Sequence, residues 1–143
     1  MGYNKKALTE AIRFHGHLGP YLVLGILMGK YALRNLKAKK YFGLEIKVKG
    51  ADKKPRSCLI DGLQLSTGAT FGKGNIKKLS GKHIQVLFYN LNNKRKLALS
   101  LKDSLEFKLG KLKNHQDSEV FAERIYKTSY NKLFNLIPIT HKL

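Results

Sequence analysis

Two histidines separated by a single glycine, His15 and His17, are the first residues along the chain that could do chemistry. In an extended segment, residues two apart point to the same side, so both imidazoles could face one pocket. That pocket would lie at the start of a helix expected from Pro20, where free N–H groups and the helix dipole favour an anion. The alternative is a pair of loop histidines that donate hydrogen bonds to backbone carbonyls.

Cys58 is the only cysteine of the chain and is expected at the first position of a short helix, with Ser57 as its N-cap. There the helix dipole lowers the pKa of a thiol and makes it a better nucleophile or metal ligand. Asp61, three residues on, shares its helix face, and Gln64 continues the polar stripe. Cys58 and Asp61 are therefore the candidate catalytic residues. The alternative is that Cys58 is a small buried hydrophobic residue.

A glycine-rich run occupies residues 67–75 (TGATFGKGN). It is not a nucleotide-binding P-loop, because its glycine spacing is too short and a glycine follows the lysine where Ser or Thr would bind magnesium. Its backbone amides could still approach an anion, with a lysine side chain supplying charge. The candidate cofactor-binding residues are Gly72, Lys73, Gly74 and Asn75, and we expect Lys73 to border the same pocket as the histidines. The alternative is a tight connection that needs positive φ.

Hydrophobic patterning predicts an α+β domain in which a mostly antiparallel sheet packs with helices. The second helix is apolar nearly all round and is expected to be the buried central helix, with Gly25 and Gly29 allowing close packing. From residue 103 onwards the chain is expected to be mainly helical, ending near Pro138. Earlier helices are expected at 5–14, 20–35 and 58–66, and strands at 43–50, 83–89 and 94–101.

Length and cysteine content limit the architecture. A chain of 143 residues is expected to form a single domain, 1–143. One cysteine excludes an intrachain disulfide and a zinc site built from several thiolates of the same chain. The start lacks the layout of a secretory signal, and the uncharged run 14–29 is too short to cross a bilayer. We therefore expect a cytoplasmic protein that does not enter the membrane.

The net charge of +19 comes from 28 Lys and Arg against 9 Asp and Glu. Such a charge attracts polyanions, which makes a basic nucleic-acid-binding protein the rival hypothesis. Most of the basic residues are lysines scattered along the chain, whereas reading of bases favours arginine. We therefore expect only non-specific nucleic-acid binding. An anionic small-molecule ligand is the other hypothesis that the charge supports.

Together these motifs resemble those of the E-subunit family of formylmethanofuran dehydrogenase. Its first motif runs like His-Gly-His-x-Cys-Pro-Gly, and residues 15–21 here read HGHLGPY. Its second runs like Cys-x-x-Asp-(Ala/Gly)-x-Gln-x-x-Thr-Gly-Cys-Thr-x-Gly-Lys-Gly-Asn, and residues 58–75 match it without a gap. The resemblance is clear over about residues 10–100. Gly19 and Ala69 replace two cysteines of the motifs, and the cysteine-rich zinc module of many relatives is absent.

The resemblance implies a dimeric α+β domain linked to one-carbon and molybdenum- or tungsten-enzyme metabolism, including methanogenesis, in an anaerobe. His15, His17 and Cys58 would be the metal ligands, and three protein ligands plus water form an open zinc site. The expected cofactor is a divalent metal, zinc. The expected partners are a second copy of the chain and a larger oxidoreductase complex. Whether the domain is itself an enzyme stays open, as does a degenerate paralogue that acts only in assembly.

Overall fold

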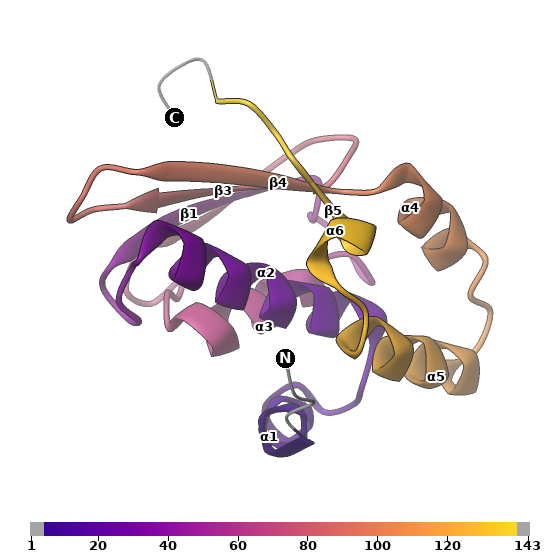
Figure 1. Ribbon diagram of the computed structural model, residues 1–143. Coiled ribbons are helices and arrows are strands. Elements are labelled where there is room, and N and C mark those ends of the chain that lie inside the picture. The colour runs from indigo at the N-terminus through magenta and orange to yellow at the C-terminus, as the bar shows by residue number, and fades with distance from the viewer. Residues whose placement is uncertain (1–4, 140–143) are drawn as a thin grey trace.

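The computed structural model describes residues 5–139, which form one sheet covered on one face by helices (Figure 1). The strand order is β2-β1-β3-β4-β5. Only the β1–β2 pair is parallel, and the other three pairs are antiparallel. The α+β class with a mostly antiparallel sheet is therefore confirmed. The strands are β1 (Leu44–Lys49), β2 (Ile76–Leu79), β3 (Gln85–Asn90), β4 (Lys96–Leu101) and β5 (Phe134–Leu136).

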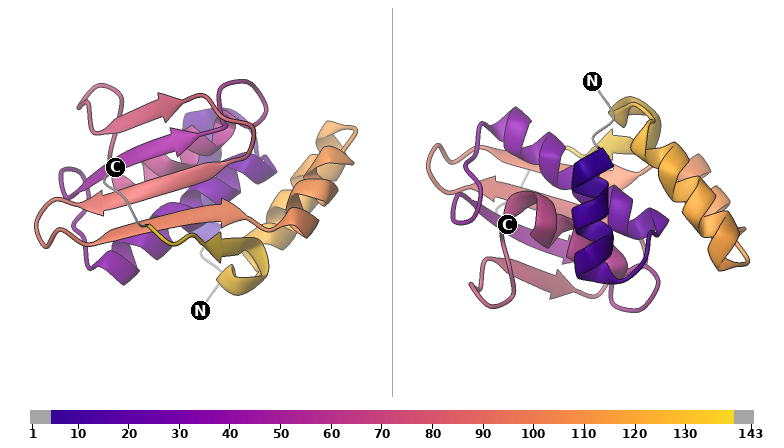
Figure 2. Two further views of the ribbon diagram at one scale, coloured as in Figure 1. Left: turned by 90° about the horizontal axis from the view of Figure 1, so that it is seen from above. Right: turned by 90° about the horizontal axis from the view of Figure 1, so that it is seen from below.

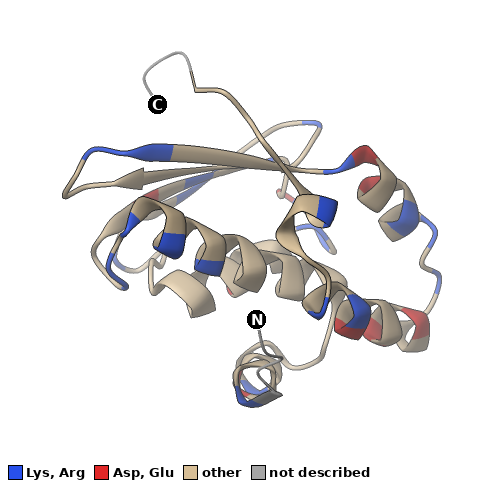
Figure 3. Cartoon of the chain, in the orientation of Figure 1, with Lys and Arg blue, Asp and Glu red and all other residues tan. Residues whose placement is uncertain are grey.

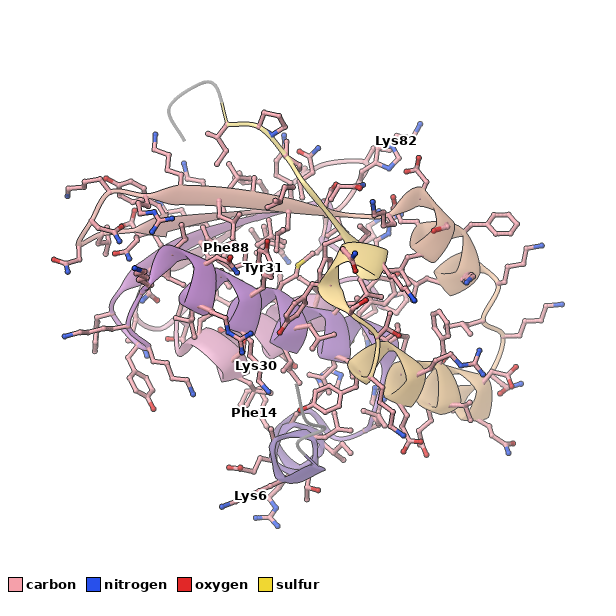
Figure 4. All side chains as sticks on the ribbon, viewed as in Figure 1. Lys6, Phe14, Lys30, Tyr31, Lys82 and Phe88 are labelled. Carbon is pink, nitrogen blue, oxygen red and sulfur yellow. The ribbon has the colours of Figure 1, made fainter. Side chains whose placement is uncertain are left out.

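The helix α2 is the centre of the molecule, as its apolar sequence predicts. Its side chains are mostly buried, and fully buried Phe88 of β3 lies between it and the sheet (Figure 4). A Cβ at Gly25 would collide with the carbonyl oxygen of Leu59, and one at Gly62 with that of Leu22. The backbones of α2 and α3 therefore touch. The helices are α1 (Lys5–His15), α2 (Pro20–Leu36), α3 (Cys58–Thr67), α4 (Asp103–Gly110), α5 (His115–Tyr126) and α6 (Tyr130–Leu133).

The remaining helices lie around this pair. Figure 2 shows α1 crossing beneath α2 and α3, while α4 and α5 stand together at one end of the sheet. Two buried residues, Leu8 and Ala11, fix α1 to the core. Among the described residues, no helix is long and apolar enough to cross a membrane.

Three local expectations were wrong. Ser57 has helical backbone angles and its side chain makes no capping hydrogen bond. The strand β2 was not expected, because only Ile76 of its four residues is buried and no alternation shows. The region after residue 103 is mainly helical as expected, but its last helix ends at Leu133 and not near Pro138, and β5 follows and pairs with β4. Both missed strands depend on a neighbouring strand far away in sequence.

Candidate functional site

The junction of α1 and α2 brings the two predicted histidines together. His15 is the last residue of α1, and Gly16 turns the chain with a φ of +109°. Pro20 then begins α2. The ring centroids of His15 and His17 are 4.8 Å apart. The two imidazoles are therefore neighbours on one side of the turn, as the spacing predicts.

Asp61 of α3 holds the imidazole of His15. The distance from His15 Nδ1 to Asp61 Oδ2 is 2.6 Å, and the His15 side chain is only 10% exposed. A carboxylate accepts, so Nδ1 carries the proton and donates it. In the neutral ring, Nε2 then presents its lone pair. Asp61 fixes both the orientation and the tautomer of His15, and the catalytic role expected for Asp61 and Cys58 stays a prediction.

The other nitrogen of this ring, His15 Nε2, is buried without a hydrogen-bond partner. In folded proteins nearly every buried polar atom has a partner, and each exception needs an explanation. Among the described residues, Tyr130 Oη is the one other such atom. A buried lone pair beside a second imidazole is suited to a ligand that is not part of the chain.

Cys58 lies one helical turn before Asp61 and is partly buried. Burial raises the pKa of its thiol, and the Asp61 carboxylate raises it further, against a smaller lowering by Lys54. The expectation that the helix start lowers this pKa was therefore wrong, because desolvation and a nearby carboxylate outweigh the dipole. Without a bound cation, Cys58 is a protonated thiol at neutral pH.

A third imidazole, which the sequence did not indicate, comes from α5. The ring centroids of His115 and His17 are 6.0 Å apart. Asn114 caps α5 by accepting the Asp117 N–H at 2.8 Å, so His115 is the first helical residue. No motif links positions 17 and 115. The local signal that could have drawn attention to His115 is the capping residue Asn114, which marks the start of α5.

The histidines, Asp61 and Cys58 do not form a ready metal site. Within residues 5–139, no three His, Cys, Asp or Glu side chains are gathered so that they could hold a metal ion as they stand. The metal ligation expected for His15, His17 and Cys58 therefore stays a prediction. It requires a rearrangement that gathers these three side chains.

The glycine-rich run lies at the other end of α3. That helix has 10 residues, so its ends are about 15 Å apart at 1.5 Å per residue. Gln64, expected to extend the stripe from Cys58, accepts the Phe71 N–H at 3.1 Å instead. The structure does not bring Lys73 to the histidines, so the expectation of one shared pocket was wrong.

Hydrogen bonds within the run use several of its expected anion-binding groups. The Lys73 N–H donates to Thr70 Oγ1 at 3.1 Å, and the Gly74 N–H to the carbonyls of Thr70 and Phe71. The side chain of Asn75 accepts from the Thr70 N–H and donates to the Tyr41 carbonyl. These bonds favour the alternative of a tight connection. Cofactor binding by Gly72, Lys73, Gly74 and Asn75 stays a prediction.

A separate cavity of about 500 Å³ lies between α1, α2 and α3. Lys30 points from α2 toward it (Figure 4), and burial lowers the pKa of this lysine, with the charge of Arg34 adding to the effect. Arg34 and Lys40 line it as well, opposite Glu10, over an apolar floor. The excess of cations suits the expected anionic small molecule better than the glycine-rich run does, and binding of such a molecule stays a prediction.

The sequence model of one protein family matches residues 14–136. Its description is FmdE, Molybdenum formylmethanofuran dehydrogenase operon. The chain belongs to this family. The match extends past the resemblance described above and includes α4, α5 and β5. FmdE membership relates the chain to the formylmethanofuran dehydrogenase operon. Comparison with curated proteins gives no match.

The two cysteines of the family motifs that are replaced in this chain occupy different places in the structure. A Cβ at Gly19 would stand 3.2 Å from His17 Cε1 and 3.6 Å from its Nδ1. The cysteine of the family motif at this position would therefore lie against the His17 ring. Ala69 is buried at the far end of α3, away from the histidines. Of the two replacements, Gly19 is the one that changes the histidine site.

Proposed function

We propose that this FmdE-family chain is a metal-binding domain that holds one divalent ion, zinc, at the α1–α2 junction. The observation that carries the proposal is the buried, unpartnered Nε2 of His15, whose other nitrogen donates to Asp61. Histidines that bind metals characteristically donate their second N–H to a carboxylate, which fixes the tautomer and raises the basicity of the ligating nitrogen. His15 already has that arrangement.

His17 and Cys58 would supply the further ligands. His17 stands beside His15 on the turn, and Cys58 begins the helix that carries Asp61. Zinc binds both imidazole nitrogen and thiolate, and three such ligands leave one position for water. When bound, the ion would supply Lewis acidity at that open position. Asp61 is then a positioning residue that acts through His15.

A second hypothesis follows from the absence of a preformed three-ligand group in the described part of the chain. A histidine oriented by a carboxylate is also the arrangement of a general base. In that case His15 Nε2 would take a proton from a bound substrate without a metal. The two hypotheses differ in metal content, which makes that content the deciding measurement.

The experiment is elemental analysis combined with zinc titration of the purified protein. We expect about one equivalent of zinc per chain, lost in His15→Ala and weakened in His17→Ala and Cys58→Ser. His83→Ala is the matched control, because this imidazole is 63% exposed, lies 3.6 Å from Glu106 and is not one of the proposed ligands. Wild-type protein that stays metal-free in excess zinc would reject the metal hypothesis and leave the general-base one.

We also propose that the chain assembles with an oxidoreductase of the formylmethanofuran dehydrogenase type in an anaerobe. The description of the matching family names the operon of that enzyme, which is what supports the proposal. We propose an accessory role in one-carbon metabolism that uses molybdenum or tungsten. Co-purification of the tagged chain with a dehydrogenase of this type from its own cells would support it, and recovery of the chain alone would count against it.

A further inference from the structure

The loop between α2 and β1 exposes two adjacent aromatic side chains. Tyr41 is 59% exposed and Phe42 is 72% exposed. The Lys73 ammonium lies 5.7 Å from the ring centroid of Tyr41 and 5.2 Å from that of Phe42. Phe71, two residues before that lysine, is 51% exposed. We call Tyr41, Phe42 and Phe71 the aromatic cluster.

Two hydrogen bonds hold this loop in a conformation that a non-glycine residue rarely adopts. Tyr41 has a φ of +76°. Its N–H donates to the Thr67 carbonyl at 2.8 Å, and its carbonyl accepts from Asn75 Nδ2 at 2.7 Å. Thr67 and Asn75 are themselves buried. Such backbone strain persists only where the surroundings enforce it, and it is common at functional sites. The fold therefore places these rings in solvent through fixed contacts.

The charge around the aromatic cluster is positive. Lys37, Lys39 and Lys40 precede it in the same loop. The turn between β3 and β4, with Lys94 and Arg95, packs against the same end, where Asn93 Nδ2 donates to the Leu36 carbonyl at 3.0 Å. Glu45 is the acidic residue nearest in sequence. Five of the nine acidic residues lie instead on α4 and α5, at the far end in Figure 3: Asp103, Glu106, Asp117, Glu119 and Glu123.

We propose that the aromatic cluster binds single-stranded nucleic acid, with bases stacked on its rings and phosphates held by the lysines around it. Proteins that bind single strands without sequence preference combine aromatic platforms with cationic grooves in this way. A second copy of the chain is the less suitable occupant, because it would bring +19 of like charge to a basic surface. Duplexes keep their base faces stacked and cannot use the rings. The lysines that would hold the phosphates are Lys39, Lys40 and Lys73.

The chain contains a matched control for this surface. Phe107 on α4 is 67% exposed, and the Lys111 ammonium lies 4.8 Å from its ring centroid, but this pair stands at the end that carries most acidic residues. We would measure fluorescence anisotropy of oligo(U) and oligo(dT) of about 12 nucleotides, and of a duplex of equal length, in about 0.15 M salt. The proteins are wild type, Phe42→Ala and Phe107→Ala, each checked by thermal unfolding.

We expect Phe42→Ala to weaken binding of a single strand about tenfold while Phe107→Ala leaves it unchanged. We also expect the wild type to prefer single strands over the duplex. Equal effects of the two substitutions, or equal affinity for the duplex, would overturn the proposal and leave only general charge attraction. A Phe42→Ala protein with unchanged affinity but altered sedimentation would also overturn it, and would assign the aromatic cluster to self-association.

Discussion

At the scale of single residues, the hydrogen bond between Asp61 and His15 should control the affinity for zinc. Replacing Asp61 by Asn removes the carboxylate that orients His15, so zinc should bind about 10- to 100-fold more weakly. Competition with a chromophoric chelator measures this affinity. His83→Ala should bind as the wild type does, because its ring is 63% exposed and is not one of the proposed ligands. An unchanged affinity in Asp61→Asn would show that this carboxylate does not orient a metal ligand.

The raised pKa of Cys58 predicts slow alkylation at neutral pH. Iodoacetamide reacts with the thiolate, so the rate should keep rising as the pH passes the ordinary pKa of a cysteine. Asp61→Asn should speed the reaction near neutral pH, because it removes the second-largest cause of the raised pKa. Burial, the largest cause, remains in that variant. A thiol that reacts faster than glutathione at neutral pH would contradict this account.

The same thiol makes metal binding depend on pH. A thiolate ligand must lose its proton, so zinc affinity should rise about tenfold per pH unit while Cys58 is protonated in the free protein. Above neutral pH, the slope should therefore disappear in Cys58→Ser, as measured by zinc titration at several pH values. A slope that is the same in both proteins would remove Cys58 from the ligand set.

Gly19 offers a test by gain of function. Its backbone is extended, so its φ and ψ suit cysteine, and the new Cβ would stand tightly against the exposed ring of His17, which must shift slightly. We expect Gly19→Cys to bind zinc more tightly, because it restores a thiolate that the family motif has. Gly110→Cys adds a thiol where no atom lies within 4 Å of the new Cβ, and it should leave the affinity unchanged. Equal gains in both variants would mean that any added thiol binds zinc.

The sequence predicted part of this site because its signals are local. The spacing of His15 and His17, and of Cys58 and Asp61, is fixed by the turn and by one helix face. The distance of His115 from His17 depends on how α5 packs against α2, nearly a hundred residues later. The direction of the Cys58 pKa depends on burial, which a helix position alone does not determine. Local spacing therefore identified the residues, whereas the protonation of Cys58 and the approach of His115 depend on tertiary packing.

At the scale of elements, the contact between α2 and α3 controls stability. Gly25→Ala would push a methyl group into the Leu59 carbonyl, in a place where both backbones are fixed. We expect a loss of about 1–3 kcal/mol or more in the free energy of unfolding, measured by urea denaturation. Gly110→Ala is the control, since no atom lies within 4 Å of its new Cβ. Equal stability of the two variants would contradict the close approach.

Strong local patterns gave the right elements and weak ones did not. The strand β1 alternates apolar and polar residues, and α2 has a proline at its start and a continuous apolar sequence. Both were predicted almost to their ends. The strands β2 and β5 have four and three residues, and each exists because it pairs with a neighbour, β1 or β4. Pairing of this kind leaves no periodic signal in the sequence.

At the scale of the whole molecule, the homodimer that the resemblance implies stays a prediction. The apolar surfaces of α2 and α3 do not require a second copy, because they are already covered within one chain. Exposed apolar side chains such as Phe14 on α1 and Val120 on α5 are candidates for an interface. We expect a twofold dimer by analytical ultracentrifugation in about 0.3 M salt, where surface charges are largely screened. A monomer under these conditions would contradict it.

Few buried side chains hold α1 against the core, so ligand binding should stabilise the packing of this helix. Two buried side chains, Leu8 and Ala11, and the bond from His15 to Asp61 tie this helix to the core. Segments with few buried contacts open at a small free-energy cost. A metal ion bound by both His15 and Cys58 would link α1 to α3. A ligand that binds only the state in which α1 is packed on the core stabilises that state. Amide hydrogen exchange in α1 should therefore slow when zinc is added, while exchange in β3 should not change.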